Sequence, residues 1–343
     1  MVDKKKAFVL VGVGNTDAQE KIEKPALSFL QDAWRRLKKN KLALIAFWFL
    51  GLLMAFALVS NVFVTQKSAN SFDPDQVATY GNLPTNSGLG IPGWNGIFKI
   101  PGATESSNVY KDQSVPKGEY FLLGTDSLGR SVAKRLIVGI RISLLIAIAA
   151  TCIDLFIGVT YGLISGYVGG WLDTLMQRLI EIISSIPNLV IVTMLGLLLG
   201  NGLFSIVLAI GLTGWTSMAR QVRNMTLSYR EREFVLASRT LGEKPWKVAF
   251  KHILPNISGV IIVQIMMSIP SAIMYEAVLS AINLGVKPPT ASLGSLIADA
   301  QENLQYYPYQ IILPSLALCL ISLAFILLGD GLRDAFDPKS SQE

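Results

Sequence analysis

Charged residues are scarce in this chain of 343 residues. They make up 16% of the sequence, whereas soluble proteins average about 25%. Hydrophobic residues make up 51% and fall in long runs, and the mean hydropathy is +0.46. This composition excludes an ordinary soluble domain and indicates an integral membrane protein that crosses the bilayer several times.

The residues that carry most enzyme chemistry are also scarce. The chain has a single histidine, His252, and no cluster of cysteine and histidine, which excludes the usual zinc sites. No GxxxxGK[ST] loop is present to hold a nucleotide phosphate, and no Ser/His/Asp set stands in a supporting context. We therefore expect no catalytic residue, no metal and no cofactor bound by this chain.

Two further features exclude other classes. Cys152 and Cys319 both lie inside apolar runs, which predicts small buried side chains and no disulfide. The net charge of +6 is modest, and no patch of interleaved basic and aromatic residues indicates a nucleic acid partner.

The first residues, MVDKKKAFVLVGVGN, resemble a signal peptide but have a short apolar core, so an uncleaved tail is expected.

Six apolar segments are long enough to cross a bilayer, which takes about 20 residues of helix. They cover residues 42–64, 142–164, about 172–199, 203 to about 218, 257–281 and about 311–329. Pro187 and Pro270 lie inside the third and fifth segments and predict kinks. The expected fold is an all-α integral membrane protein with six transmembrane helices.

Basic residues predict which ends of these helices are cytoplasmic. Ten Lys and Arg residues precede residue 42 and eight lie between residues 219 and 252, whereas the loops 201–202 and 283–308 hold none and one. With six crossings both rich regions fall on one side, so cytoplasmic N- and C-termini are expected. A basic cluster then lies on the outer side: Arg130, Lys134, Arg135 and Arg141. Long outer segments tolerate such charges, so this cluster does not change the predicted orientation.

This topology divides the chain into five parts: a cytoplasmic tail (1–41), the first transmembrane helix (42–64), an extracellular insert (65–135), a domain of five helices with a cytoplasmic loop at 219–256 (136–332), and a second cytoplasmic tail (333–343). The insert is rich in Gly, Pro, Asn and Ser and is expected to be mostly loops.

The first tail also has helical spacing of apolar residues. Leu27, Leu30, Trp34 and Leu37 recur three and four apart, opposite basic residues. This pattern predicts an N-terminal amphipathic interfacial helix on the inner face of the membrane. The alternative is an exposed basic leader that docks on nothing.

The cytoplasmic loop contains the stretch EREFVLASRTLGEKPWKVAFKHILPN, which we call the knuckle, residues 231–256. Its first part predicts a helix with a short apolar stripe at Phe234, Ala237 and Leu241. Gly242 stands where a helix commonly ends in a residue with positive φ.

The second part of the knuckle predicts another short helix. Pro245 suits its first turn, the helix would cover residues 246–252, and Pro255 would interrupt the ladder before the fifth span. Such a knuckle is either a solvated connection or a helix that docks in a groove of a cytoplasmic partner.

The knuckle resembles the EAA loop of permease subunits in bacterial ABC importers, in which a Glu-Ala-Ala triplet precedes a glycine and an Ile/Leu-Pro close. Leu236, Ala237 and Ser238 stand at the triplet, Gly242 at the glycine, and Ile253, Leu254 and Pro255 at the close. Five more motifs resemble the second permease subunit of oligopeptide and dipeptide importers: WRRLKKNKLALI, LGTDSLGRSV, GGWLDTLMQRLIEIISSIPNL, LGVKPPTASLG and LLGDGLRDAFDP. The triplet, LSAINLG and Leu293 depart from the family pattern.

The resemblance implies the type I ABC importer permease fold in a bacterial cell membrane. It implies a pore-forming subunit for oligopeptide import, with a second homologous permease, two ATPases that use ATP and Mg, and an extracellular peptide-binding protein as partners. The knuckle would be the coupling helix, seated in a cleft of an ATPase. The residues that take this role are Glu233, Phe234, Leu236, Ala237, Ser238, Arg239 and Gly242. Importers of nickel complexes or other small solutes are the alternative within the family.

Other polar residues have two interpretations each. Asp154 lies mid-span, where a lipid-facing carboxylate would cost about 2.5–3.5 kcal/mol; it would either accept a peptide amine in a translocation cavity or hydrogen-bond a neighbouring helix. Asp126 and Arg130 would either contact the binding protein or cap the second span. Arg178 and Glu181 predict an intrahelical pair or a gate.

Two expectations complete the sequence interpretation. The motif GDGLRD, residues 329–334, would end the last span as a charged anchor. A secondary transporter that needs no ATPase is the rival class, and it would require paired intramembrane charges or inverted repeats.

Overall fold

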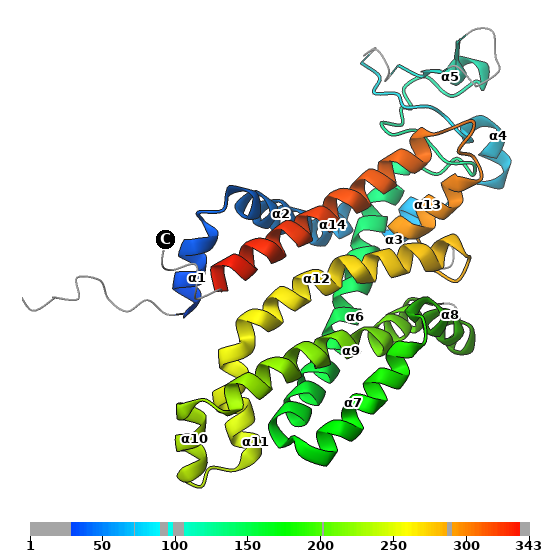
Figure 1. The fold of residues 1–343 in the computed structure, drawn as a ribbon. Coiled ribbons are helices and arrows are strands. Elements are labelled where there is room, and N and C mark those ends of the chain that lie inside the picture. Colours follow the sequence, from blue (N-terminus) through cyan, green and yellow to red (C-terminus); the bar gives the residue numbers. More distant parts are fainter. Residues whose placement is uncertain are drawn as a thin grey trace, which may run out of the picture.

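The computed structural model describes residues 29–71, 73–89, 95–98, 106–200, 202–286 and 290–336. The signal-like stretch, Leu27 and residues 337–343 of the second tail lie outside these ranges. Long helices form a bundle, and a smaller lobe stands beyond one end of it (Figure 1).

Within these described ranges, five helices are long and apolar enough to cross a membrane: α2 (Lys41–Phe63), α6 (Val132–Val168), α9 (Leu203–Arg230), α12 (Leu254–Ala281) and α14 (Tyr309–Phe336). α7 (Gly170–Ser185) and α8 (Asn188–Leu199) meet the same criteria only as a pair bent by 83°, which makes a sixth crossing if the pair is one span. The predicted kink at Pro187 is therefore a complete break, because this residue is extended, with ψ of 126°. Pro270 lies inside α12, which runs on without interruption.

Several of the helices are longer than the apolar runs that predicted them. α6 begins ten residues before residue 142, at Val132, and α9 continues past residue 218 to Arg230. α14 continues through GDGLRD to Phe336, so the prediction that this motif stops the helix is wrong. Apolar length measures the hydrocarbon thickness, and a helix can continue beyond it in contact with its neighbours. Gly331 serves close packing, since a Cβ there would lie 2.2 Å from the Cβ of Ala43.

The predicted interruption at Pro255 is also wrong. α11 (Pro245–Val248) passes through a π-helical turn (Ala249–Ile253) directly into α12. Pro255 follows this π-helical turn in the first turn of α12, and the helix passes it without ending. The knuckle is thus joined rigidly to the fifth long helix.

α6 and α9 pack against each other through glycines. A Cβ at Gly158 would lie 2.6 Å from the Cβ of Met218, and one at Gly162 would lie 2.5 Å from the carbonyl oxygen of Ala219. Small residues four apart let two helix backbones approach closely, a common way to join helices in lipid. This seam runs through the centre of the bundle.

Both cysteines are exposed on the bundle surface and unpaired, so the prediction that they are buried is wrong. An apolar run in a membrane helix includes its lipid-facing side, and for that reason it gives no information on which residues point inward.

The lobe between α2 and α6, which we call the insert, is built from short helices, turns and strands. It contains α3 (Gln66–Asn70), a 3-10 turn (Pro74–Gln76), α4 (Val77–Tyr80), α5 (Val109–Asp112) and a two-stranded antiparallel ladder of β1 (Ile97–Phe98) and β2 (Ser107–Asn108). In the ladder Ile97 pairs with Asn108.

The insert is tied to the start of α14. Leu83 is fully buried, and its carbonyl accepts a hydrogen bond of 2.8 Å from the hydroxyl of Tyr309. The amide of Gln310 donates to the side chain of Asn82 and to the carbonyl of Thr125, both at 2.9 Å. These long-range bonds give the loop-rich segment a defined position.

Candidate functional site

The knuckle forms a capped helical turn, as the glycine predicts. α10 (Glu233–Thr240) ends at Leu241, and Gly242 adopts φ of +78°. The N–H of Gly242 donates to the carbonyl of Arg239 at 3.0 Å, and the N–H of Glu243 donates to that of Ser238 at 3.2 Å. This pair of bonds is the Schellman motif, which depends on a left-handed residue.

Glu243, which the sequence interpretation missed, holds the two halves of the knuckle together. Its carboxylate accepts a hydrogen bond from the hydroxyl of Ser238 and lies 2.7 Å from Nε2 of His252. The ammonium groups of Lys247 and Lys251 lie 3.8 Å away. The bond from Ser238 and, next, the bond from His252 lower the pKa of Glu243. A glutamate four residues before a lysine is the one local signal that could have singled it out.

The knuckle buries one face and exposes another. Val235 is fully buried in a cluster with Val248 and Ile253. The opposite face is apolar but exposed: Phe234 43%, Leu236 46%, Leu241 88% and Trp246 64%. Glu233, Ala237 and Arg239 are exposed beside them, whereas Ser238 is buried. The predicted residues thus divide into an anchoring side and a free apolar surface, to which Trp246 is an unpredicted addition.

The base of the knuckle is fixed to three helices. Asp173 of α7 accepts two bonds of 2.6 Å from Arg223 of α9 and one of 2.5 Å from Ser165 of α6. Arg230, the last residue of α9, donates to the carbonyl of Gly166 at 3.2 Å. These bonds join α6, α7 and α9 at the end of α9 where the knuckle begins.

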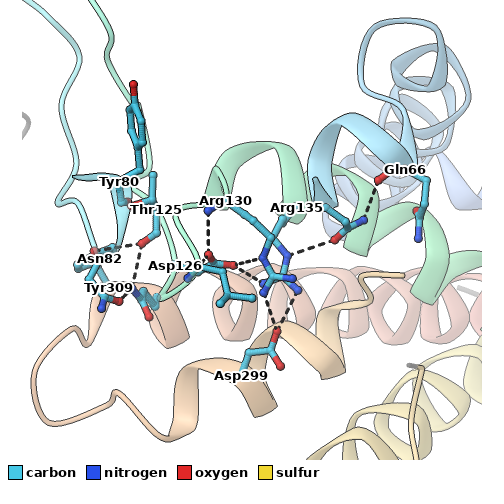
Figure 2. Close-up of polar contacts among 12 residues, drawn as sticks. Gln66, Tyr80, Asn82, Thr125, Asp126, Arg130, Arg135, Asp299 and Tyr309 are labelled. Atoms are coloured by element: carbon cyan, nitrogen blue, oxygen red, sulfur yellow. Dashed lines mark hydrogen bonds and ion pairs between the residues drawn. The ribbon is translucent and has the colours of Figure 1, made fainter. Parts of the chain in front are cut away.

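A second polar cluster lies at the opposite end of α6, where Figure 2 shows Asp126 between two arginines. Asp126 accepts from Arg130 at 2.8 Å and from Arg135 at 2.7 Å. Arg135 also reaches Asp299 of α13 (Leu293–Gln301) at 2.9 Å and Asn70 of the insert at 3.4 Å. This cluster joins the insert, α6 and α13.

The contact of Asp126 and Arg130 with a binding protein stays a prediction. Their side chains are only 10% and 7% exposed, because each is engaged by the other. Asp126 also accepts from the backbone N–H groups of Leu128 and Arg130, at 3.0 and 2.9 Å, and so orders the turn before α6. Their position fits the alternative, a cap on the second long helix.

Glu276 of α12 is a second residue that the sequence interpretation missed. It is fully buried and accepts hydrogen bonds from three hydroxyl groups: Ser143 at 3.1 Å, Ser280 at 2.9 Å and Ser292 at 2.6 Å. These serines lie on α6, on α12 and just before α13. The carboxylate therefore fastens α13 to both long helices, and two of its three partners lie far from it in the sequence.

Asp154 is buried, as expected, but its Oδ1 atom accepts no hydrogen bond from a neighbouring helix. Among the residues that the structure describes, no donor reaches this atom. The carboxylate lies against α9, where a Cβ at Gly214 would come within 2.3 Å of Oδ2. The contact with a peptide amine stays a prediction.

The comparison with known families identifies the chain. Residues 158–342 match the family described as "Binding-protein-dependent transport system inner membrane component". The chain belongs to this family. Residues 28–84 also match the N-terminal TM domain of oligopeptide transport permease C. The two matched regions include α1 (Phe29–Leu37), α2 and every helix from α7 to α14.

Curated relatives resemble the permease over nearly its whole length. It is 61% identical over 338 residues to the dipeptide transport system permease protein DppC of Lactococcus lactis subsp. cremoris, covering 98% of each chain. It is 38% identical to the oligopeptide transport system permease protein OppC of Bacillus subtilis, covering 95% of this chain and 94% of that one. The match at this identity confirms the predicted resemblance to permease subunits of this kind.

Solved structures support the fold. A chain of the inward-facing MetNI methionine ABC transporter superposes with a TM-score of 0.50 at 18% identity, covering 58% of this permease and 95% of that chain. The permease has the type I importer fold and is a multi-pass protein of the inner membrane.

Proposed function

We propose that this permease is a pore-forming subunit of an ATP-driven importer of oligopeptides. The observation that carries the proposal is the knuckle: an apolar surface, exposed in this chain, on a segment that Val235 anchors to the bundle and Glu243 holds together. Leu241 and Trp246 expose 88% and 64% of their surface to water unless a partner covers them. An amphipathic helix of this kind suits a groove on a second protein.

The proposed partners follow from this surface and from the family to which the chain belongs. A cytoplasmic ATPase would receive the knuckle, and two such subunits would use ATP and Mg while this chain binds neither. A second homologous permease would complete the pore, and an extracellular peptide-binding protein would deliver the substrate to the end that carries the insert. The basic residues in and before the knuckle favour a cytoplasmic position for it and for both termini.

The proposed substrate class rests on the names of the relatives. DppC of Lactococcus lactis is named for dipeptides and OppC of Bacillus subtilis for oligopeptides. A further relative, GsiD of Pectobacterium atrosepticum, is 31% identical and is named for glutathione, itself a small peptide. Peptides are therefore favoured over nickel complexes and other small solutes.

Affinity purification of the full chain in mild detergent tests the proposal. We expect two ATPase subunits, a second permease and a peptide-loaded binding protein to be recovered with it. Recovery of the chain alone, with transport that does not depend on ATP, would indicate a secondary transporter instead. A binding protein loaded with a metal complex would keep the class and change the substrate.

A further inference from the structure

The proposed function leaves a group of exposed cations beside α1 without a role. Arg35 lies on α1, Lys38 and Lys39 follow it, and Lys41 begins α2. All four residues are exposed, while Leu37, on the other face of α1, is only 2% exposed. We call these four residues the basic collar.

α1 holds the basic collar in a fixed place. Leu37 lies against Gly331 of α14, where a Cβ would come within 3.2 Å of its Cδ1. The ring of Trp34 packs edge-on against Phe47 of α2, with centroids 5.1 Å apart, and Nζ of Lys38 lies 5.3 Å from the centroid of Trp34. The cations are therefore presented by a docked helix.

The neighbouring side chains show the depth of the basic collar relative to the bilayer. Leu42, Ile45 and Trp48 of α2 are 61%, 65% and 59% exposed, and they directly follow Lys41 on a transmembrane helix. Such side chains face hydrocarbon or another membrane chain. The cations that precede them lie at the level of lipid headgroups, together with Trp34, a residue type enriched at that level.

The charge of this surface is mainly positive. Asp32 is engaged by Arg36 at 2.7 Å, so it does not neutralise the basic collar. The same point is the N-terminal, positive end of the dipole of α2, a helix of 23 residues. We propose that the basic collar binds the phosphate headgroups of anionic lipids in the leaflet that it faces. Each lysine or arginine near an anionic surface strengthens such binding by about fivefold.

Lipid retention by the full chain, purified in mild detergent with its partners, tests this proposal. Native mass spectrometry would compare bound phosphatidylglycerol and phosphatidylcholine with identical acyl chains. We expect the wild type to retain phosphatidylglycerol preferentially, and K38Q/K39Q/K41Q to lose at least about tenfold in apparent affinity for it. Retention of phosphatidylcholine should not change.

Two control variants separate the basic collar from net charge and from misfolding. K67Q/K111Q/K117Q removes three exposed lysines from the insert and should retain phosphatidylglycerol like the wild type. K38R/K39R/K41R keeps the charge and should also retain it. Equal retention of both lipids by the wild type, or equal loss in both glutamine variants, would overturn the proposal. Loss of the ATPase subunits with lipid retention intact would show instead that the basic collar docks a protein.

Discussion

Nε2 of His252 lies 2.7 Å from the carboxylate of Glu243, across the turn that Gly242 forms. The same carboxylate accepts the hydroxyl of Ser238 on α10. A single acidic side chain thus closes the first helix of the knuckle onto the π-helical turn that leads into α12. If the knuckle couples an ATPase to the bundle, it does so as one rigid unit.

Replacing Gly242 tests whether the shape of this turn is needed. A left-handed backbone costs a β-branched residue about 1–2 kcal/mol, although no atom lies within 4 Å of a Cβ at this position. We expect Gly242→Val to lower peptide uptake about tenfold or more while membrane insertion and ATP hydrolysis persist, and Gly242→Pro to act similarly. Uptake and ATPase assays in vesicles measure both quantities.

Gly51→Ala is the matched control, since Gly51 lies in α2 with open space around a Cβ and an ordinary helical φ. It should transport like the wild type. Normal uptake by Gly242→Val would show that the turn is not part of the coupling route.

Acid should loosen the knuckle through Glu243. Hydrogen bonds from Ser238 and His252 lower the pKa of this carboxylate. A group with a lowered folded pKa stabilises the fold above its unfolded pKa, about 4.3 for glutamate, and that contribution is lost as the pH falls through the folded pKa. We expect amides of residues 233–252 to exchange faster below about pH 4.3, after correction for the intrinsic rate.

Hydrogen-exchange mass spectrometry measures this effect. Glu243→Gln should exchange faster than the wild type already at pH 7 and show a smaller acid step. Glu231→Gln, an exposed change just before α10, should behave like the wild type. An identical acid step in the wild type and in Glu243→Gln would place the sensitive group elsewhere.

Removing Arg135 should destabilise the end of the bundle that carries the insert. This side chain is 3% exposed and engages Asp126 and Asp299. Breaking a buried ion pair by removing one partner costs about 3–5 kcal/mol. We expect Arg135→Gln to lower the melting temperature in detergent markedly and to speed proteolysis of the insert.

Arg178→Gln is the control for that experiment. Arg178 and Glu181 form the predicted intrahelical pair at 2.6 Å, with side chains 71% and 56% exposed. Exposed pairs contribute about 0–1 kcal/mol, so this variant should melt almost like the wild type. Equal melting temperatures for the two variants would contradict the structural role of Arg135.

Asp154 and Gly214 should respond differently to substitution. Asparagine fits the place of Asp154, so Asp154→Asn should change the uptake of neutral and of basic peptides to the same extent. Gly214→Ala places a methyl group 2.3 Å from Oδ2 of Asp154 and should reduce the yield of folded protein. Uptake assays and size-exclusion profiles measure the two effects. A selective loss of basic-peptide uptake in Asp154→Asn would place this carboxylate in the translocation cavity.

The sequence predicted features that depend on near neighbours. Gly242 and Pro245 signalled the turn and the helix start, because backbone conformation alone requires those residue types there. The apolar runs predicted the crossings, since hydrocarbon thickness fixes their length. These are local constraints, and one sequence contains them in full.

Long-range partners could not be predicted in this way. Glu276 looked like a single acid in an apolar run, because Ser143 is 133 positions away. The ion pairs that Asp126 and Arg130 form with Arg135 and Asp299 depend on the fold, because Asp299 lies far away along the chain. Pro255 was predicted to break the helix. The structure accommodates it in the first turn of α12, directly after a π-helical turn that the sequence pattern did not indicate.

The unbroken course of α6 has a mechanical consequence. Its 37 residues run from the cluster around Arg135 to the carbonyl of Gly166 that Arg230 holds. At about 1.5 Å per residue the helix is roughly 55 Å long, so a tilt of about 5° around one end displaces the other by about 5 Å. A lever of this length can convert a small rotation at the knuckle into a side-chain-sized opening beneath the insert.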